Sequence, residues 1–229
     1  GTSLAALVAS HREQLLGEVD LLLGRFPVLF KLIDAKQTLS VQVHPDEETA
    51  GRLGGGARPK TEAWYILHTE PDARLYLELK EGGGRAELER ALESGEVAEL
   101  LYEVRVQPGD FVYLPSGTLH AIGGGLVLAE IQQASDTTYR VFDWNRVGLD
   151  GKPRQLHVRE ALESIHFDVR GKPAHAAPRS GRPGILCSAF SFERVGLGPG
   201  DQAVLDAGRA RIICCVEGIR LMAVASSCV

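Results

Sequence analysis

The sequence lacks the features that would place it in a membrane, on nucleic acid or in a disulfide-bonded fold. No run reaches the roughly 18 apolar residues of a membrane-spanning helix, and no charged-then-apolar secretion signal opens it. The net charge of −5 disfavours broad nucleic-acid binding. None of its 4 cysteines has CxxC spacing, which argues against zinc fingers and redox motifs. A reducing, cytoplasmic setting is therefore expected.

What remains is an ordinary globular composition. The chain has 229 residues, of which 44% are hydrophobic and 24% charged. This length is enough to bury a sizeable core in one large domain or two small ones.

Three short stretches carry the residue types of a metal site. Gln42 and His44 stand two apart in LSVQVHP, so on a strand both side chains leave the same face. Glu62 opens the strand-like run EAWYIL, and His120 closes GDFVYLPSGTLH. Two imidazoles, a carboxylate and an amide oxygen in one small barrel suit a divalent metal ion.

A single histidine on a half-apolar strand is more often a core residue than a ligand. The spacing of Gly109–His120 changes that balance, because Gly-x5-Pro-x-Gly-x2-His matches the second cupin motif. Gly124 stands where that motif usually has asparagine. The pattern predicts a metal-binding cupin.

Two further residues indicate acid–base chemistry. Lys60 stands two residues before Glu62 on the same predicted strand face. Glu130 lies in LVLAEI, where it shares a face with two leucines, and an unpaired buried charge costs several kcal/mol. Glu130 is thus either an acid/base group in the barrel mouth or a strand-end residue facing water.

The remaining patterns complete a mainly β fold with helical insertions. Helices are expected over residues 3–17, 86–94, 96–102 and 157–165, and a flexible surface loop over 51–59. We expect a metal-binding cupin (jelly-roll) domain over 1–167, a linker over 168–184 and a partial second cupin unit over 185–229.

Five stretches together resemble the type I phosphomannose isomerases of the cupin superfamily: LSVQVHPD, KTEAWYIL, GDFVYLPSGTLHAIGGG, AEIQQASDTTYRVFDWNR and GLDGKPRQLHV. The resemblance implies one zinc ion per chain, held by Gln42, His44, Glu62 and His120. It also implies a catalytic arginine at Arg140, an active-site lysine and acid at Lys60 and Glu130, and further substrate contacts at Ser40 and Arg146.

The resemblance implies interconversion of mannose 6-phosphate and fructose 6-phosphate through an enediol. Family members have additional β-structure before the first helix and a complete second cupin, so a fragment is expected. Two alternatives stay open, an iron-dependent cupin dioxygenase and a non-catalytic sugar-phosphate-binding cupin. The expected partner is a small sugar phosphate, without nucleic acid or membrane, and the oligomeric state is not assigned.

Overall fold

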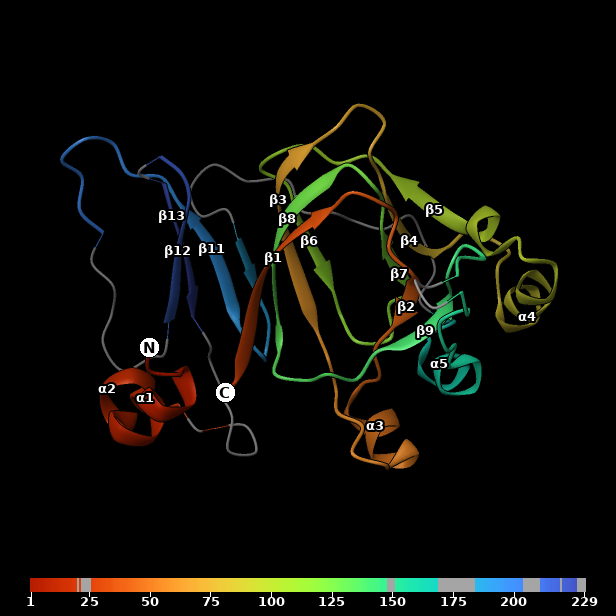
Figure 1. The fold of residues 1–229 in the computed structure, drawn as a ribbon, viewed down its shortest axis with the longest axis horizontal. Coiled ribbons are helices and arrows are strands. Elements are labelled where there is room, and N and C mark those ends of the chain that lie inside the picture. The colour runs from red at the N-terminus through yellow and green to blue at the C-terminus, as the bar shows by residue number, and fades with distance from the viewer. Residues whose placement is uncertain are drawn as a thin grey trace.

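The computed structural model describes residues 1–19, 21, 26–147, 151–168, 184–203, 211–218 and 220–225. Within them, three antiparallel sheets and a set of short helices form successive layers (Figure 1). In the described part of the chain, no helix is both long and apolar enough to cross a bilayer.

Two of the sheets face each other and form the barrel. The first has the order β1-β8-β3-β6, with strands Val28–Ala35, Leu126–Gln133, Glu62–Thr69 and Phe111–Leu114. The second has the order β5-β4-β7-β2-β9, with strands Leu101–Val104, Leu75–Leu79, His120–Ile122, Val41–Val43 and Tyr139–Phe142. This is the mainly β barrel that the sequence predicts.

The barrel core explains why strand β3 reads as a continuous apolar run. Trp64 and Ile66 belong to the core between the two sheets, whereas Ala63 and Tyr65 pack on the opposite face of the strand. Burial on both faces removes the need for polar alternation. The inner core also includes Leu75, Leu77, Val112, Leu114, Leu126 and Leu128.

The third sheet lies against the outer face of the first. Its order is β10-β11-β13-β12, with strands Gly184–Leu186, Ser191–Val195, Arg220–Ala225 and Arg211–Glu217. Phe192 of β11 meets Phe111 of β6 edge to face, with ring centroids 5.4 Å apart. Most of the predicted linker, residues 169–183, lies outside the described residues, so the division at 168–184 stays a prediction.

The helices sit at the periphery, and two helix predictions need correction. Residues 3–17 form two helices, α1 (Leu4–Ser10) and α2 (Arg12–Leu16), because the backbone leaves helical geometry at His11. In 96–102 only the 3-10 turn η1 (Val97–Leu100) forms, since Leu101 already pairs with β4 as the start of β5.

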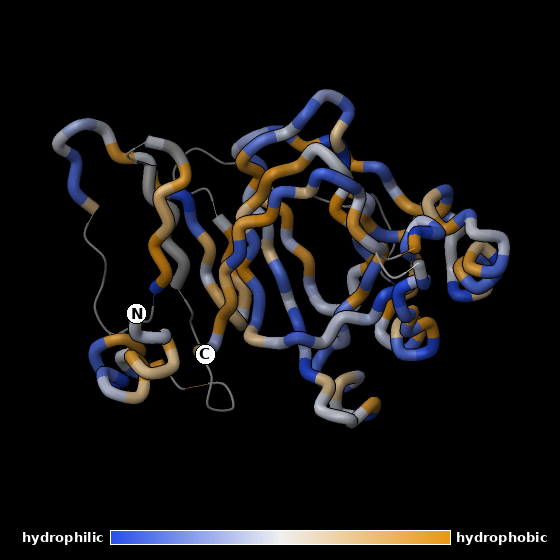
Figure 2. Tube along the Cα trace, in the orientation of Figure 1, coloured by the Kyte–Doolittle hydropathy of each residue, from blue (hydrophilic) through white to orange (hydrophobic). Residues whose placement is uncertain are grey.

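Helices α4 (Arg85–Ser94) and α5 (Val158–Ser164) lie where expected, and a further helix, α3 (Glu47–Leu53), precedes β3. The first residues of the predicted 51–59 loop belong to the end of α3, and Gly54 then ends the helix with a φ of +64°. Helices α4 and α5 cover the outer face of the second sheet, and Figure 2 shows the apolar segments concentrated on the strands.

Candidate metal centre and its surroundings

The metal-ligand candidates meet at one end of the barrel. Gln42 on β2 pairs directly with His120 on β7, and His44 follows the end of β2. Glu62 begins β3 on the facing sheet. One ligand atom from each of His44, Glu62 and His120 lies within 4.8 Å of the others, and all three side chains are buried.

Both imidazoles are oriented by backbone carbonyls. Nδ1 of His44 donates to the Thr137 carbonyl at 2.9 Å, and Nδ1 of His120 donates to the Thr118 carbonyl at 3.0 Å. The proton on Nδ1 leaves each Nε2 with a lone pair, as in histidine ligands of metal sites. These Nε2 atoms lie 3.3 and 3.6 Å from the two oxygens of Glu62.

Gln42 adds an amide to the same cluster. Its Nε2 lies 3.1 Å from Nε2 of His120, and a half-turn of the amide would place the oxygen there instead.

The charges at the cluster match what a metal ion requires. Burial raises the pKa of Glu62, but His44 and Lys60 outweigh it and hold that pKa well below its ordinary value. Burial lowers the pKa of His120 to about 4, with a contribution from His44. An ionised carboxylate and a neutral imidazole are the ligand forms that bind divalent metals.

Glu62 supplies the clearest sign that the cluster is built for a cation. Both of its oxygens are buried without a hydrogen-bond partner in the part of the chain that the structure describes. Lys60 Nζ lies 2.7 Å from Oε1, close enough for an ion pair but outside hydrogen-bond geometry. The carboxylate is thus stabilised by neighbouring positive charge rather than by hydrogen bonds, and the residues present fit a divalent metal ion between these donors.

Glu130 lies inside the barrel beside this cluster. It pairs across the strands with Lys31 on β1 and Trp64 on β3, so the three side chains share one face. Trp64 Nε1 donates to one Glu130 oxygen at 2.9 Å, and Lys31 Nζ lies 2.8 Å from the other. Because Glu130 is only 4% exposed, it does not face water.

Lys31, Trp64 and Gln132 are members of this site that the motif analysis does not identify. Lys31 also donates to Gln132, and the ring centroids of Trp64 and His120 are 5.5 Å apart. A signal for Lys31 exists in the sequence, since it is the only charged residue in FPVLFKLI.

Arg140 and Ser40 flank the cluster from the second sheet. Arg140 on β9 pairs with Gln42, and its Nε donates to the Ser40 hydroxyl at 3.3 Å. A second nitrogen donates to the Gln155 carbonyl at 2.9 Å. Burial and the charge of Arg154 lower the pKa of Arg140.

The Arg146 guanidinium is taken up by hydrogen bonds within the protein. Its guanidinium donates to the Thr38 carbonyl at 2.6 Å, to the Asp143 carbonyl at 3.2 Å and to the Asp143 carboxylate at 2.5 Å. Arg154 binds the same carboxylate. A separate cavity of about 450 Å³ is lined by Arg146, Asp143, Arg154 and Lys36.

The loop before His120 is held against the cluster by Gly117. Its N–H donates to the His44 carbonyl at 2.8 Å, and its φ is +88°. A Cβ at this position would come within 2.5 Å of the His166 ring, which in turn bonds Asp46 at 2.8 Å. The second glycine of the cupin motif is thus required by both conformation and space.

Comparison with known proteins identifies the relatives of this chain. Residues 1–62 match the family model of the phosphomannose isomerase type I catalytic domain. A mannose-6-phosphate isomerase of Bacillus subtilis is 46% identical over 165 residues, which is 72% of this chain and 51% of that protein. One of Streptococcus mutans is 41% identical over 182 residues, or 78% of this chain and 54% of that protein. The chain thus spans about half the length of these curated relatives.

Solved structures agree with the sequence comparison. The crystal structure of the Bacillus subtilis mannose 6-phosphate isomerase aligns with a TM-score of 0.69 at 34% identity, covering 86% of this chain and 60% of that one. A mannose 6-phosphate isomerase bound with zinc and yttrium shares the fold, with a TM-score of 0.67 at 22% identity over 99% of this chain and 81% of that one. The chain is therefore related in sequence and in cupin fold to the type I phosphomannose isomerases, and the resemblance read from its motifs is confirmed.

Proposed function

We propose that this chain carries the site of a metal-dependent isomerase that interconverts mannose 6-phosphate and fructose 6-phosphate. The proposal rests on the surroundings of Glu62. Among the described residues, neither oxygen of this buried carboxylate has a hydrogen-bond partner, and the two oxygens lie near the Nε2 atoms of His44 and His120. The substrate is inferred from the relatives, which are named mannose-6-phosphate isomerases.

The proposed metal is one zinc ion held by Gln42, His44, Glu62 and His120. Two imidazoles and a carboxylate suit zinc, and a fold relative binds zinc. When bound, a zinc ion supplies the positive charge that stabilises a developing substrate oxyanion.

The proposed isomerisation moves one proton between C1 and C2 of the open-chain sugar. Glu130 is the proposed carrier: it takes the proton from C2 of the aldose, a proton passes from O2 to O1 in the resulting enediolate, and Glu130 returns its proton to C1 to give the ketose. Both Glu130 oxygens already accept hydrogen bonds, so protonation at Oε1 would release Lys31 to donate to a sugar oxygen. Lys60 is held at the edge of the metal cluster, where its N–H groups can donate to the other sugar oxygen.

The proposed anion contacts lie on the second sheet. Arg140 and Ser40 are adjacent, and two of the three Arg140 guanidinium nitrogens contact neighbouring groups, so that among the described residues the third has no partner and could bind the substrate. Arg146 would contribute positive charge rather than a direct contact, since the protein already uses all its nitrogens.

The test is a coupled isomerase assay on the purified chain, with metal content measured on the same sample. Turnover that is lost on chelation and restored by zinc would support the proposal. Mannose 6-phosphate binding without turnover by a folded, zinc-loaded chain would refute it and favour a sugar-phosphate-binding cupin. Activity that requires iron(II) and dioxygen would assign the dioxygenase class instead.

A further inference from the structure

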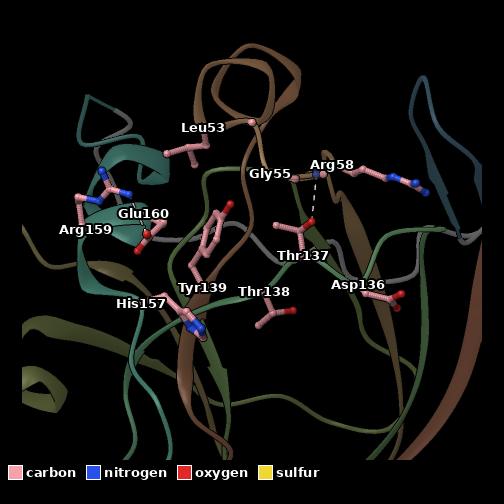
Figure 3. Close-up of a pocket in the computed structure, with 13 residues that line it drawn as sticks. Leu53, Gly55, Arg58, Asp136, Thr137, Thr138, Tyr139, His157, Arg159 and Glu160 are labelled. Atoms are coloured by element: carbon pink, nitrogen blue, oxygen red, sulfur yellow. Dashed lines mark hydrogen bonds and ion pairs between the residues drawn. The ribbon is translucent and has the colours of Figure 1, made fainter.

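A second cavity lies outside the barrel, on the far side of the segment that anchors His44. It has a volume of about 580 Å³, opens to solvent and is bordered by the loop after α3, residues 136–139 and the start of α5 (Figure 3). Small-molecule sites in proteins usually have volumes of about 300–1,000 Å³. The cavity is therefore large enough for a ligand the size of a monosaccharide.

The cavity presents hydroxyl and imidazole groups rather than net charge. The side chains of Thr137, Thr138, Tyr139 and His157 line it, and Figure 3 shows the Tyr139 hydroxyl directed between α3 and α5. His157 Nδ1 accepts the Arg140 N–H at 3.3 Å, which leaves Nε2 as a donor. Burial and the charge of Glu160 raise the pKa of Tyr139, so the phenol keeps its proton.

The charged residues around the cavity balance each other. Arg58 and Arg159 are matched by Asp136 and Glu160, and Arg159 pairs with Glu160 at 3.1 Å. This balance does not favour an anion such as a phosphate ester. Neutral donors and acceptors beside an aromatic ring match the hydroxyl groups and C–H faces of an uncharged sugar or polyol.

The wall between this cavity and the metal cluster is a single segment of chain. The Thr137 side chain lines the cavity, where its Oγ1 accepts a hydrogen bond from the Arg58 N–H at 3.0 Å. Its carbonyl accepts the Nδ1 proton of His44 on the other side. Any ligand that holds Thr137 in place also holds the acceptor that orients His44.

We propose that this outer cavity is a second binding site, for an uncharged polyhydroxylated small molecule, and that its occupation strengthens metal binding through Thr137 and His44. The binding part is tested apart from the isomerase reaction, although Thr138 accepts a hydrogen bond from Lys60 at 3.5 Å and His157 accepts one from the Arg140 N–H at 3.3 Å. The coupling part rests on the proposed metal site, and linkage requires that metal and polyol affect each other's affinity by the same factor.

The binding test uses D-mannitol, an uncharged six-carbon polyol, on the metal-free chain, followed by saturation-transfer NMR and calorimetry. A Kd of roughly 1 mM is expected for a ligand of this size. Tyr139→Phe removes one hydroxyl and should raise the Kd about fivefold. Leu53→Trp places a larger ring in the cavity and should weaken binding. Tyr102→Phe, the same change on the opposite edge strand of the sheet, should leave the Kd unchanged.

The coupling test measures zinc affinity with and without saturating mannitol. Zinc should bind about fivefold tighter with mannitol present, and mannitol should bind about fivefold tighter with zinc present. An unchanged zinc affinity would refute the coupling alone. If zinc itself does not bind, the proposed metal site fails, while mannitol binding to the metal-free chain still decides the second site.

Two results would overturn the second site. One is no mannitol binding, or binding that both Tyr139→Phe and Leu53→Trp leave intact. The other is a shift of the Tyr139 and Leu53 NMR signals on addition of inorganic phosphate but not of mannitol. That result would make the cavity an anion site. Circular dichroism of each variant checks folding, and the conservative Tyr139→Phe variant remains decisive if Leu53→Trp does not fold.

Discussion

Replacing Gly117 by alanine tests how the loop before His120 is held in the barrel. Gly117 has a φ of +88°, and an added Cβ would approach Cγ of His166 to 2.5 Å. An L-residue in the left-handed region costs about 1–2 kcal/mol. The clash adds to that strain, because nothing can occupy the methyl position until the imidazole moves.

The size of the clash term is limited by what His166 gives up when it moves. Its side chain is 40% exposed, so the ring can turn into solvent. It then loses mainly the 2.8 Å hydrogen bond to Asp46, worth about 0.5–1.5 kcal/mol at a partly solvated site. Gly117→Ala should therefore destabilise the fold by about 1.5–3.5 kcal/mol in total.

Urea unfolding measures this change as a shift in midpoint at constant slope. Gly109→Ala is the matched control, because Gly109 has a φ of +100° with nothing within 4 Å of an added Cβ. That control should cost only about 1–2 kcal/mol. In a His166→Ala background, Gly117→Ala should fall to the cost of the control.

The proposed clash with His166 is refuted if Gly117→Ala lowers the free energy of unfolding no more than Gly109→Ala does. It is also refuted if removing the His166 ring does not reduce the effect of Gly117→Ala. A functional consequence follows from the 2.8 Å bond between the Gly117 N–H and the His44 carbonyl. Zinc affinity should fall in Gly117→Ala, typically tenfold or more as for lost outer-shell contacts, and stay near normal in Gly109→Ala.

Four further predictions address the site. Glu62→Gln should abolish high-affinity zinc binding and also destabilise the metal-free chain, because the buried Lys60 loses its ion-pair partner; calorimetric zinc titration with thermal unfolding checks both, and retained zinc affinity would contradict the ligand assignment. Glu130→Gln should keep zinc and substrate binding while kcat falls by roughly 10²–10⁴; near-normal turnover in a zinc-loaded active form would remove Glu130 from the mechanism. Arg140→Met should weaken binding of mannose 6-phosphate far more than of mannose, whereas Arg146→Met should mainly lower stability, and equal losses for both sugars would make Arg140 structural. Burial raises the pKa of Glu78 from 4.5 to about 7, so the native state holds a proton that the unfolded state has lost; stability should fall as pH rises from about 4.5 to 7, by up to about 3 kcal/mol, and Glu78→Gln should flatten this dependence.

Much of the fold is predictable because strand periodicity and turn residues act locally. Alternation places Gln42 and His44 on one strand face, and Gly109 and Gly117 mark turns that only glycine accommodates easily. Local signals fail where pairing overrides them. Residues 96–102 have helical character, but Leu101 becomes a strand because β4 offers backbone partners.

The roles expected of the charged residues depend on partners that are remote in sequence. Lys31 meets Glu130 across 99 positions, and this contact answers whether the carboxylate is paired or faces water. The resemblance implies a substrate contact for Arg146, and in the structure Asp143 and the Thr38 carbonyl accept hydrogen bonds from its guanidinium. The sequence shows which residues are cationic, but it does not show which acceptors they contact in the folded chain.

By itself the sequence determined the barrel strands, the ligand set that it predicts for a metal ion and the resemblance to the type I phosphomannose isomerases. Each of these depends on residue type and on spacing within a single strand or turn, where backbone geometry leaves few alternatives. Only the tertiary structure decided that Lys31 and Trp64 enclose Glu130, that His166 closes over Gly117, and that a second cavity lies behind His44. Those features arise from the pairing of strands and the seating of helices, which bring together side chains that no local pattern connects.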